Sequence, residues 1–254
     1  MNEQLLTIKN LRAWYQAEKY VLSEFSMELK RNEVVGLIGL NGAGKTTFMK
    51  LLSGLHDGFA ADEICMTGST WKNRMRGMHQ HKMRRGAGKN EFQDNDLKKF
   101  RYTVFAEDNS FGYFTFWEYI SYVFAAYGKK KPDVTDLVQG FHFQQYADVL
   151  MKELSTGNKK KAFLITAFAL RPELLMLDEP VNGLDFESTE FLYQLIAGYR
   201  EYGTVLFASH ILESITLTSD RVLVLEEGKI RQCFKQEEID ATQIREALRY
   251  ENDV

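Results

Sequence analysis

The chain has 254 residues, of which 44% are hydrophobic and 26% are charged, and its formal net charge is −3. This balance is ordinary for a globular protein with a sizeable core, and it excludes a molecule that binds nucleic acid through overall positive charge. The two cysteines, Cys65 and Cys233, lack metal-binding spacing, so we expect reduced thiols rather than a disulfide.

No stretch of the sequence is long and apolar enough to cross a membrane. The longest uncharged apolar run, residues 162–170, is well short of the roughly 20 residues that a spanning helix needs. Residues 1–15 lack the basic and apolar regions of a signal peptide. The sequence therefore predicts a cytosolic chain that reaches a membrane only through a partner.

Strand and helix patterns alternate along the chain. Residues 5–15 and 21–29 alternate between apolar and polar side chains, as half-buried strands do. Residues 33–40 form a short, mostly apolar run with Gly39 near its end, as expected for a buried parallel strand, and a helical pattern follows. Further buried strands are predicted at 174–179, 204–209 and 221–228, with a short helix at 210–219. This order predicts an α/β fold with a mostly parallel sheet and an N-terminal β portion.

Two regions depart from that pattern. Residues 69–91 contain seven Lys or Arg, two His and no acidic residue before Glu91. This basic stretch fits a solvated surface insertion, or a cationic contact for anionic lipid or an acidic partner, and it has no recognisable nucleic-acid motif. Residues 109–168 are rich in aromatics and are predicted to be helical throughout, as a separate lobe inserted between the two halves of the sheet.

The most specific motif is GLNGAGKT, which fits the phosphate-binding pattern G-x-x-x-x-G-K-[ST] between a strand and a helix. Its glycines let backbone N–H groups curl around phosphates, Lys45 reaches the terminal phosphates, and the Thr46 hydroxyl suits Mg²⁺. The predicted phosphate-binding residues are Gly39, Leu40, Asn41, Gly42, Ala43, Gly44, Lys45, Thr46 and Thr47.

A second motif, LLMLDEP, places two acids at the end of an apolar strand. In a P-loop nucleotidase, Asp178 stands where a Mg²⁺ ligand belongs. Glu179 can then act as a general base toward a water in line with the γ-phosphate. A strand-end acid pair is weak by itself and becomes specific beside a P-loop.

A third stretch, ELSTGNKKKAF, has the pattern of a helix start, with Ser155 or Thr156 as the cap. Its three lysines, Lys159, Lys160 and Lys161, carry the wrong charge for the positive end of a helix dipole. We therefore expect them to form a site for an anion that another molecule brings.

The order GLNGAGKT, LSTGN, LLMLDEP, NGLD and then a lone histidine after an apolar strand resembles the nucleotide-binding domain of ABC transporters over nearly the whole chain. The resemblance implies a single P-loop NTPase domain, residues 1–254. Its nucleotide-binding core would comprise residues 1–107 and 169–254, and a helical subdomain with the signature motif would comprise residues 108–168.

The resemblance also implies roles for individual residues. The signature residues Ser155, Thr156, Gly157 and Asn158 would face the γ-phosphate held by an opposing subunit. Asp185 would link the two sites across the dimer, and His210 would contact the γ-phosphate. Tyr15 would stack on adenine, with Trp14 as the competitor and filling of the sheet face as the simpler alternative for both.

Three residues differ from the family pattern. Thr156 replaces a glycine and adds bulk near phosphate, and Asn158 replaces a glutamine. Glu107 stands where the family carries a glutamine that senses Mg²⁺, and its carboxylate can still serve as a metal ligand.

The resemblance implies an ATPase subunit that binds ATP and Mg²⁺, dimerises and energises a separately encoded membrane permease. The segments EDNSF…TFWEYI and STGNKKK resemble those of bacterial exporters more closely than those of importers. Two alternatives are a soluble ABC ATPase acting in translation or on DNA, and a regulatory clamp that binds nucleotide without hydrolysis. Glu179 argues against the clamp, and the absence of a second ATPase unit argues against the soluble enzymes.

Overall fold

The computed structural model describes residues 3–16, 19–66 and 95–249, and the basic stretch at 69–91 lies outside them. Within these ranges the strands are β1 Gln4–Gln16, β2 Lys19–Lys30, β3 Val34–Ile38, β4 Phe59–Ala60, β5 Glu63–Met66, β6 Arg101–Val104, β7 Leu174–Asp178, β8 Thr204–Ser209, β9 Arg221–Glu226 and β10 Lys229–Lys235. The α-helices are α1 Lys45–Leu52, α2 Asn95–Phe100, α3 Phe116–Ala126, α4 Thr135–Gly140, α5 Thr156–Leu170, α6 Phe186–Gly198, α7 Leu212–Thr218 and α8 Ala241–Arg249. Among these helices, none has both the length and the apolar character that a membrane span requires.

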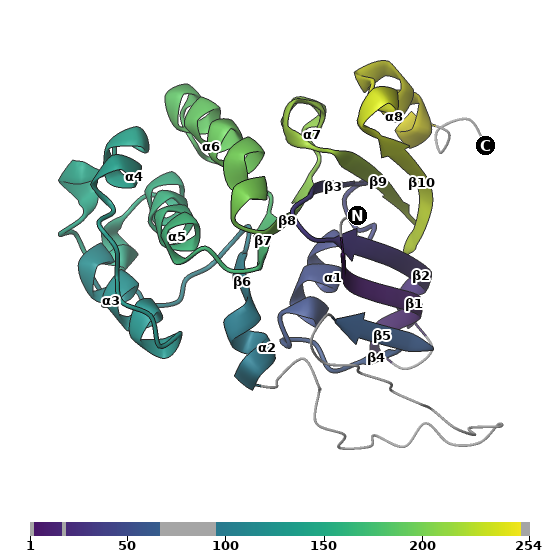
Figure 1. Cartoon of the computed structure of the whole chain (residues 1–254), viewed down its shortest axis with the longest axis horizontal. Helices are drawn as coiled ribbons and strands as arrows, with labels where there is room; N and C mark the ends of the chain where they lie inside the picture. The colour runs from purple at the N-terminus through teal and green to yellow at the C-terminus, as the bar shows by residue number, and fades with distance from the viewer. Residues whose placement is uncertain (1–2, 17–18, 67–94, 250–254) are drawn as a thin grey trace.

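The strands build two sheets (Figure 1). In the antiparallel sheet, β1 pairs with β2, β4 and β5. The second sheet has the order β10-β9-β3-β8-β7-β6, in which only the β10–β9 pair is antiparallel. The predicted mostly parallel sheet with an N-terminal antiparallel portion is confirmed. Because parallel strands end at one edge, the loops after β3, β7 and β8 are brought to the same side.

The parallel sheet lies between two apolar cores. Val34 and Ile38 of β3 belong to the core that also contains α3 and α5, whereas Val35 and Leu37 belong to the core with α1 and the antiparallel sheet. Successive side chains of a strand point to opposite faces, so a strand covered on both faces carries apolar residues throughout. This double coverage explains the unbroken apolar run in the sequence.

The prediction that residues 109–168 are helical throughout is wrong. Helices α3, α4 and α5 gather at one end of the molecule (Figure 1), but turns and two 3-10 helices, Gln144–Tyr146 and Met151–Glu153, separate them. Thr115 caps α3 through a capping box with Glu118, and a bridge pairs Thr115 with Leu150. Most of α5 is buried, and the apolar core around it also contains side chains from one face of the parallel sheet. The assignment of residues 108–168 to a separate helical subdomain stays a prediction.

Candidate functional site

The phosphate-loop motif connects β3 to α1. Gly42 and Gly44 have φ of 87° and 109°, in the left-handed region where a side chain is strained, so the two glycines permit the tight curl of the loop. Lys45 folds back into this curl, and its ammonium donates to the carbonyls of Gly39 at 2.7 Å and Leu40 at 3.3 Å. Burial lowers the pKa of Lys45, and the negative charges of the nearby carboxylates partly offset this shift. A buried cationic donor therefore stands at the centre of the loop.

Asp178, at the end of β7, faces the start of α1. The hydroxyl of Thr46 donates to Asp178 Oδ2 at 2.9 Å. Asp178 is fully buried, and its Oδ1 has no hydrogen-bond partner among the described residues. Burial raises the pKa of Asp178, although the Thr46 bond opposes the shift.

These two side chains fit a magnesium ion. The unpartnered carboxylate oxygen of Asp178 and the hydroxyl of Thr46 are hard oxygen donors, the kind that Mg²⁺ prefers. Within the described residues, no group of three or more His, Cys, Asp or Glu side chains is arranged so that it could hold a metal ion by itself. Most ligands would therefore come from water and phosphate, as is common for Mg²⁺ in phosphoryl-transfer sites.

Glu179 lies beside the P-loop, with 12% of its side chain exposed. Its Oε1 is 3.9 Å from the Lys45 ammonium, and its Oε2 lies 2.7 Å from Nδ1 of His210, which follows β8. The main-chain N–H of His210 also reaches this oxygen, at 3.4 Å. The backbone of Glu179 has φ of 48°, an unusual conformation for a non-glycine residue that is found often at functional sites. The carboxylate is thus directed between a P-loop lysine and a histidine.

The start of α5 confirms the predicted cap and shows which groups its lysines contact. Ser155 is the N-cap, and its hydroxyl accepts from the N–H of Asn158 at 3.2 Å. Each of the three lysine ammoniums has an acceptor within the chain, and the anion site expected from them stays a prediction. Lys159 donates to the side chain of Asn109 at 3.2 Å. Lys160 donates to the carbonyl of Glu179, and Lys161 donates to the carboxylate of Asp185.

Both carboxylate oxygens of Asp185 have hydrogen-bond partners. Its Oδ2 lies 2.5 Å from the Lys161 ammonium, and its Oδ1 accepts from the N–H of Ser188, so Asp185 is the N-cap of α6. Burial acts to raise the pKa of Asp185, but these hydrogen bonds hold it well below its usual range. The loop before Asp185 also touches α5, since a Cβ on Gly157 would lie 2.1 Å from the carbonyl oxygen of Gly183. The sequence predicted neither the Lys161–Asp185 pair nor the contact between Gly157 and Gly183.

The two candidate aromatics of β1 differ in position. The hydroxyl of Tyr15 lies 3.4 Å from the hydroxyl of Thr47 in α1, and its side chain is among the exposed large aromatics. The ring of Trp14 instead packs edge-on against Tyr20. Tyr15 packs on the ring of His56 at a centroid distance of 4.6 Å. The contact with Thr47 favours Tyr15 as the base-stacking residue, and His56, which the sequence did not indicate, supports it.

The predicted residues form two separate groups. The P-loop, Asp178, Glu179 and His210 are brought together. No hydrogen bond or ion pair among the described residues joins Ser155, or residues 156–158, to the P-loop. Glu107 is exposed on the loop after β6 and lines a small cavity with Thr156 and Lys160, at the start of α5 rather than at the P-loop.

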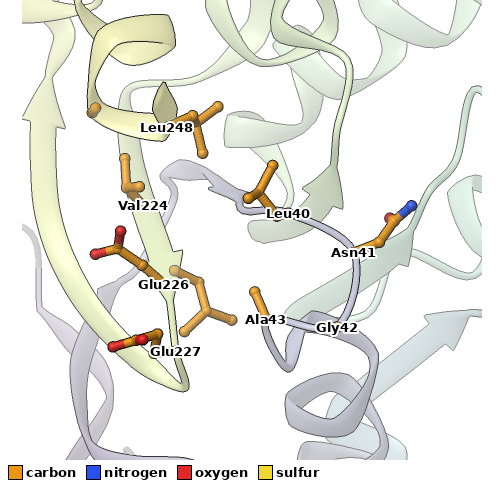
Figure 2. A pocket seen from close by; sticks show the side chains of 10 residues that line it. Leu40, Asn41, Gly42, Ala43, Val224, Glu226, Glu227 and Leu248 are labelled. Carbon is orange, nitrogen blue, oxygen red and sulfur yellow. The ribbon is translucent and has the colours of Figure 1, made fainter. Parts of the chain in front are cut away.

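A cavity of about 220 Å³ backs the first half of the P-loop (Figure 2). It lies between the loop, the β9–β10 turn and α8. Neither the P-loop lysine nor any carboxylate of β7 lines it, so we do not assign it to the phosphates. Its lining residues are Leu40, Asn41, Gly42, Ala43, Val224, Leu225, Glu226, Glu227, Ala247 and Leu248.

Comparisons with known proteins find similar sequences and similar folds. Residues 22–182 match the family model described as ABC transporter. A putative ABC transporter ATP-binding protein, AlbC of Bacillus subtilis, is 33% identical over 91% of this chain and 91% of its own length. A solved ATP-binding subunit of an ABC transporter superimposes with a TM-score of 0.76 at 24% identity, over 97% of this chain and 95% of that one. A dimeric ATP-binding cassette bound to ADP and Pi has a TM-score of 0.73 at 18% identity, over 91% of this chain and 99% of that one.

Proposed function

The chain belongs to the ABC transporter family of ATP-hydrolysing subunits, and on that premise we propose that it binds Mg-ATP, hydrolyses it as a dimer and energises a separately encoded membrane permease. The observation that carries the proposal is the meeting of Lys45, Asp178, Glu179 and His210 at one edge of the parallel sheet. A P-loop alone supports nucleotide binding, whereas a carboxylate beside it supports hydrolysis.

Each residue then has a defined task. Backbone N–H groups of the P-loop and the Lys45 ammonium bind the phosphates, exchanging the loop carbonyls for phosphate oxygens. Thr46 and Asp178 would hold Mg²⁺, which supplies charge neutralisation at the β- and γ-phosphates. Glu179 accepts a proton from the attacking water, whose oxygen bonds to the γ-phosphorus as the bond to the bridging oxygen of ADP breaks. His210 holds the carboxylate of Glu179 in position.

The second group of residues supports a dimer. Ser155 caps α5, and the first N–H groups of a helix together with its dipole attract an anion. Since no described bond links this end of α5 to its own P-loop, we propose that it faces the γ-phosphate of a second subunit. Asp185, at the cap of α6, and the loop with Gly183 lie against this region and would lie near the two-fold axis.

A groove supports the permease as partner. It has a volume of about 620 Å³ and is lined mainly by aromatic side chains and three cations, from α2, β6, α3 and the loop between β6 and α3, with residues after α1 at its margin. Such a patch, which includes the half-exposed ring of Tyr122, suits a helical segment of another protein. We propose that this contact holds the subunit at the cytoplasmic face of the membrane. We propose export as the direction of transport because the segments EDNSF…TFWEYI and STGNKKK resemble those of bacterial exporters.

The ATPase is tested with purified protein and Mg-ATP. Wild-type protein should release phosphate, and Glu179→Gln should abolish release yet accumulate an ATP-bound dimer on size-exclusion chromatography, because the binding groups remain. Unchanged hydrolysis by Glu179→Gln would exclude this carboxylate as the base.

The permease contact is tested separately. Tyr122→Glu should keep the basal ATPase and lose co-purification with the permease by about 10-fold or more, as expected for a central aromatic of an interface. Leu217→Glu is the matched control, since Leu217 is 61% exposed on α7 and does not line the groove. Equal co-purification by both variants would remove the groove from the proposal.

A further inference from the structure

The main chain of Glu179 is anchored on both sides. Its N–H donates to the carbonyl of Ala208 in β8 at 2.9 Å. Its carbonyl accepts from the ammonium of Lys160 at 2.7 Å and from the N–H of Asn182 at 3.3 Å. Between these bonds the backbone adopts φ of 48°, which a glutamate rarely adopts without support. The direction in which the carboxylate leaves the backbone therefore depends on these contacts.

Lys160 is an unusual donor for this position. It lies in the second turn of α5, only 3% exposed, although lysine is rarely buried without a specific partner. Its neighbours in sequence, Lys159 and Lys161, turn to other acceptors. Burial lowers the pKa of Lys160, and the negative charges of Asp178, Glu179 and Glu107 partly offset this shift.

We infer that Lys160 is a positioning residue for hydrolysis: its bond to the carbonyl of Glu179 fixes the strained backbone that directs this carboxylate between Lys45 and His210. The inference rests on the proposed role of Glu179 as the base. Lys160 itself contacts neither end of the carboxylate in the described hydrogen bonds, so it acts through the backbone.

The consequence of losing this bond follows from the geometry. Without the ammonium, the carbonyl of Glu179 keeps only the longer bond from Asn182, and the backbone can relax toward a more common conformation. The carboxylate would then leave its place 2.7 Å from His210. A displacement of about 1 Å at a reacting group can lower the rate on the order of 100-fold.

The bond also links two functions within one subunit. α5 begins at Ser155, which we propose faces the phosphate of the second subunit, and Lys160 lies in the same helix. A change at the start of α5 can therefore reach the base of the subunit's own site through this hydrogen bond.

The experiment compares Lys160→Met with Lys129→Met. Lys129 is the matched control because its ammonium also donates to a main-chain carbonyl, that of Leu170 at 2.9 Å, at the other end of α5. We measure kcat and KM for Mg-ATP, the Kd of a non-hydrolysable ATP analogue, and the thermal midpoint. Lys160→Met should lower kcat at least 10-fold while KM and Kd change less than threefold, and Lys129→Met should leave all three within twofold.

Two further variants complete the test. Lys160→Gln, which keeps an N–H donor on a shorter side chain, should retain more kcat than Lys160→Met, and it carries the test if the methionine variant does not fold. Glu179→Gln is measured in parallel: if it leaves kcat unchanged, the proposed function has the wrong base. If Glu179→Gln abolishes turnover but Lys160→Met stays within twofold of wild type, the inference about Lys160 is overturned. It is also overturned if kcat and analogue affinity fall by the same factor, because that result indicates a general distortion.

Discussion

Replacing Gly157 by alanine tests whether the start of α5 is packed against its own subunit. A Cβ at this position would lie 2.1 Å from the carbonyl oxygen of Gly183, and that oxygen belongs to backbone that cannot simply rotate away. Ordinary contacts of this kind begin near 3.4 Å, so α5 or the Gly183 loop would have to move by roughly 1 Å.

The expected cost is that of overpacking, about 1–3 kcal/mol of the free energy of unfolding. For a chain of this length, such a loss lowers the thermal midpoint by roughly 2–10 °C. Differential scanning calorimetry without nucleotide measures this loss apart from any contact of Gly157 with ATP.

Gly198→Ala is the matched control. Gly198 ends α6 with helical backbone, and an added Cβ would meet nothing within 4 Å. This change should stabilise the protein by about 0.5–1 kcal/mol, because alanine loses less backbone entropy on folding. If Gly157→Ala unfolds at the wild-type temperature or above it, the packing argument is refuted.

Further predictions concern the P-loop, the metal position and the dimer. Lys45→Ala should weaken nucleotide binding by more than about 10-fold in calorimetry, because a charge-assisted phosphate contact is lost. Asp178→Asn should abolish turnover yet raise the thermal midpoint at pH 7. Burial holds the pKa of Asp178 above its unfolded value, so its contribution to stability is most favourable below that unfolded value, about 3.9, and falls as pH rises through the folded pKa. The advantage of asparagine should therefore vanish as the pH is lowered toward 4. Ser155→Arg should keep ATP binding and lose hydrolysis, and mixing it with Lys45→Ala chains should restore part of the activity, because one of the two composite sites then carries no lesion. A mixture that stays inactive although heterodimers form would count against the trans role.

The sequence predicted the parallel sheet well because burial on both faces leaves an unmistakable pattern. β3 and β8 are buried at every position, and their apolar runs end at turn residues. β6 was not predicted, since it has four residues, begins with the charged Arg101 and is buried at only two of them. The helices of residues 109–168 were overextended because aromatic richness marks the core and does not locate turns.

The candidate site divides in the same way. Local motifs identify Lys45, Asp178 and Glu179 because their chemistry depends on adjacent residues. The destinations of the lysines in α5 could not be read from the sequence. Consecutive residues on a helix point about 100° apart, so each ammonium reaches a different acceptor. Those acceptors, including Glu179 and Asp185, lie in loops that only the folded chain brings to α5.

The separation of the two cores by the parallel sheet has a mechanical consequence. The core that contains α3 and α5 touches one face of the sheet, while α1 and the antiparallel sheet are packed on the other face. Sliding of the α3–α5 end relative to the sheet would shear the first core, which includes Ile38 just before the P-loop, and leave the core with α1 in place. Lys160 reaches from that end to the loop after β7 by one hydrogen bond, which such a movement can stretch or break.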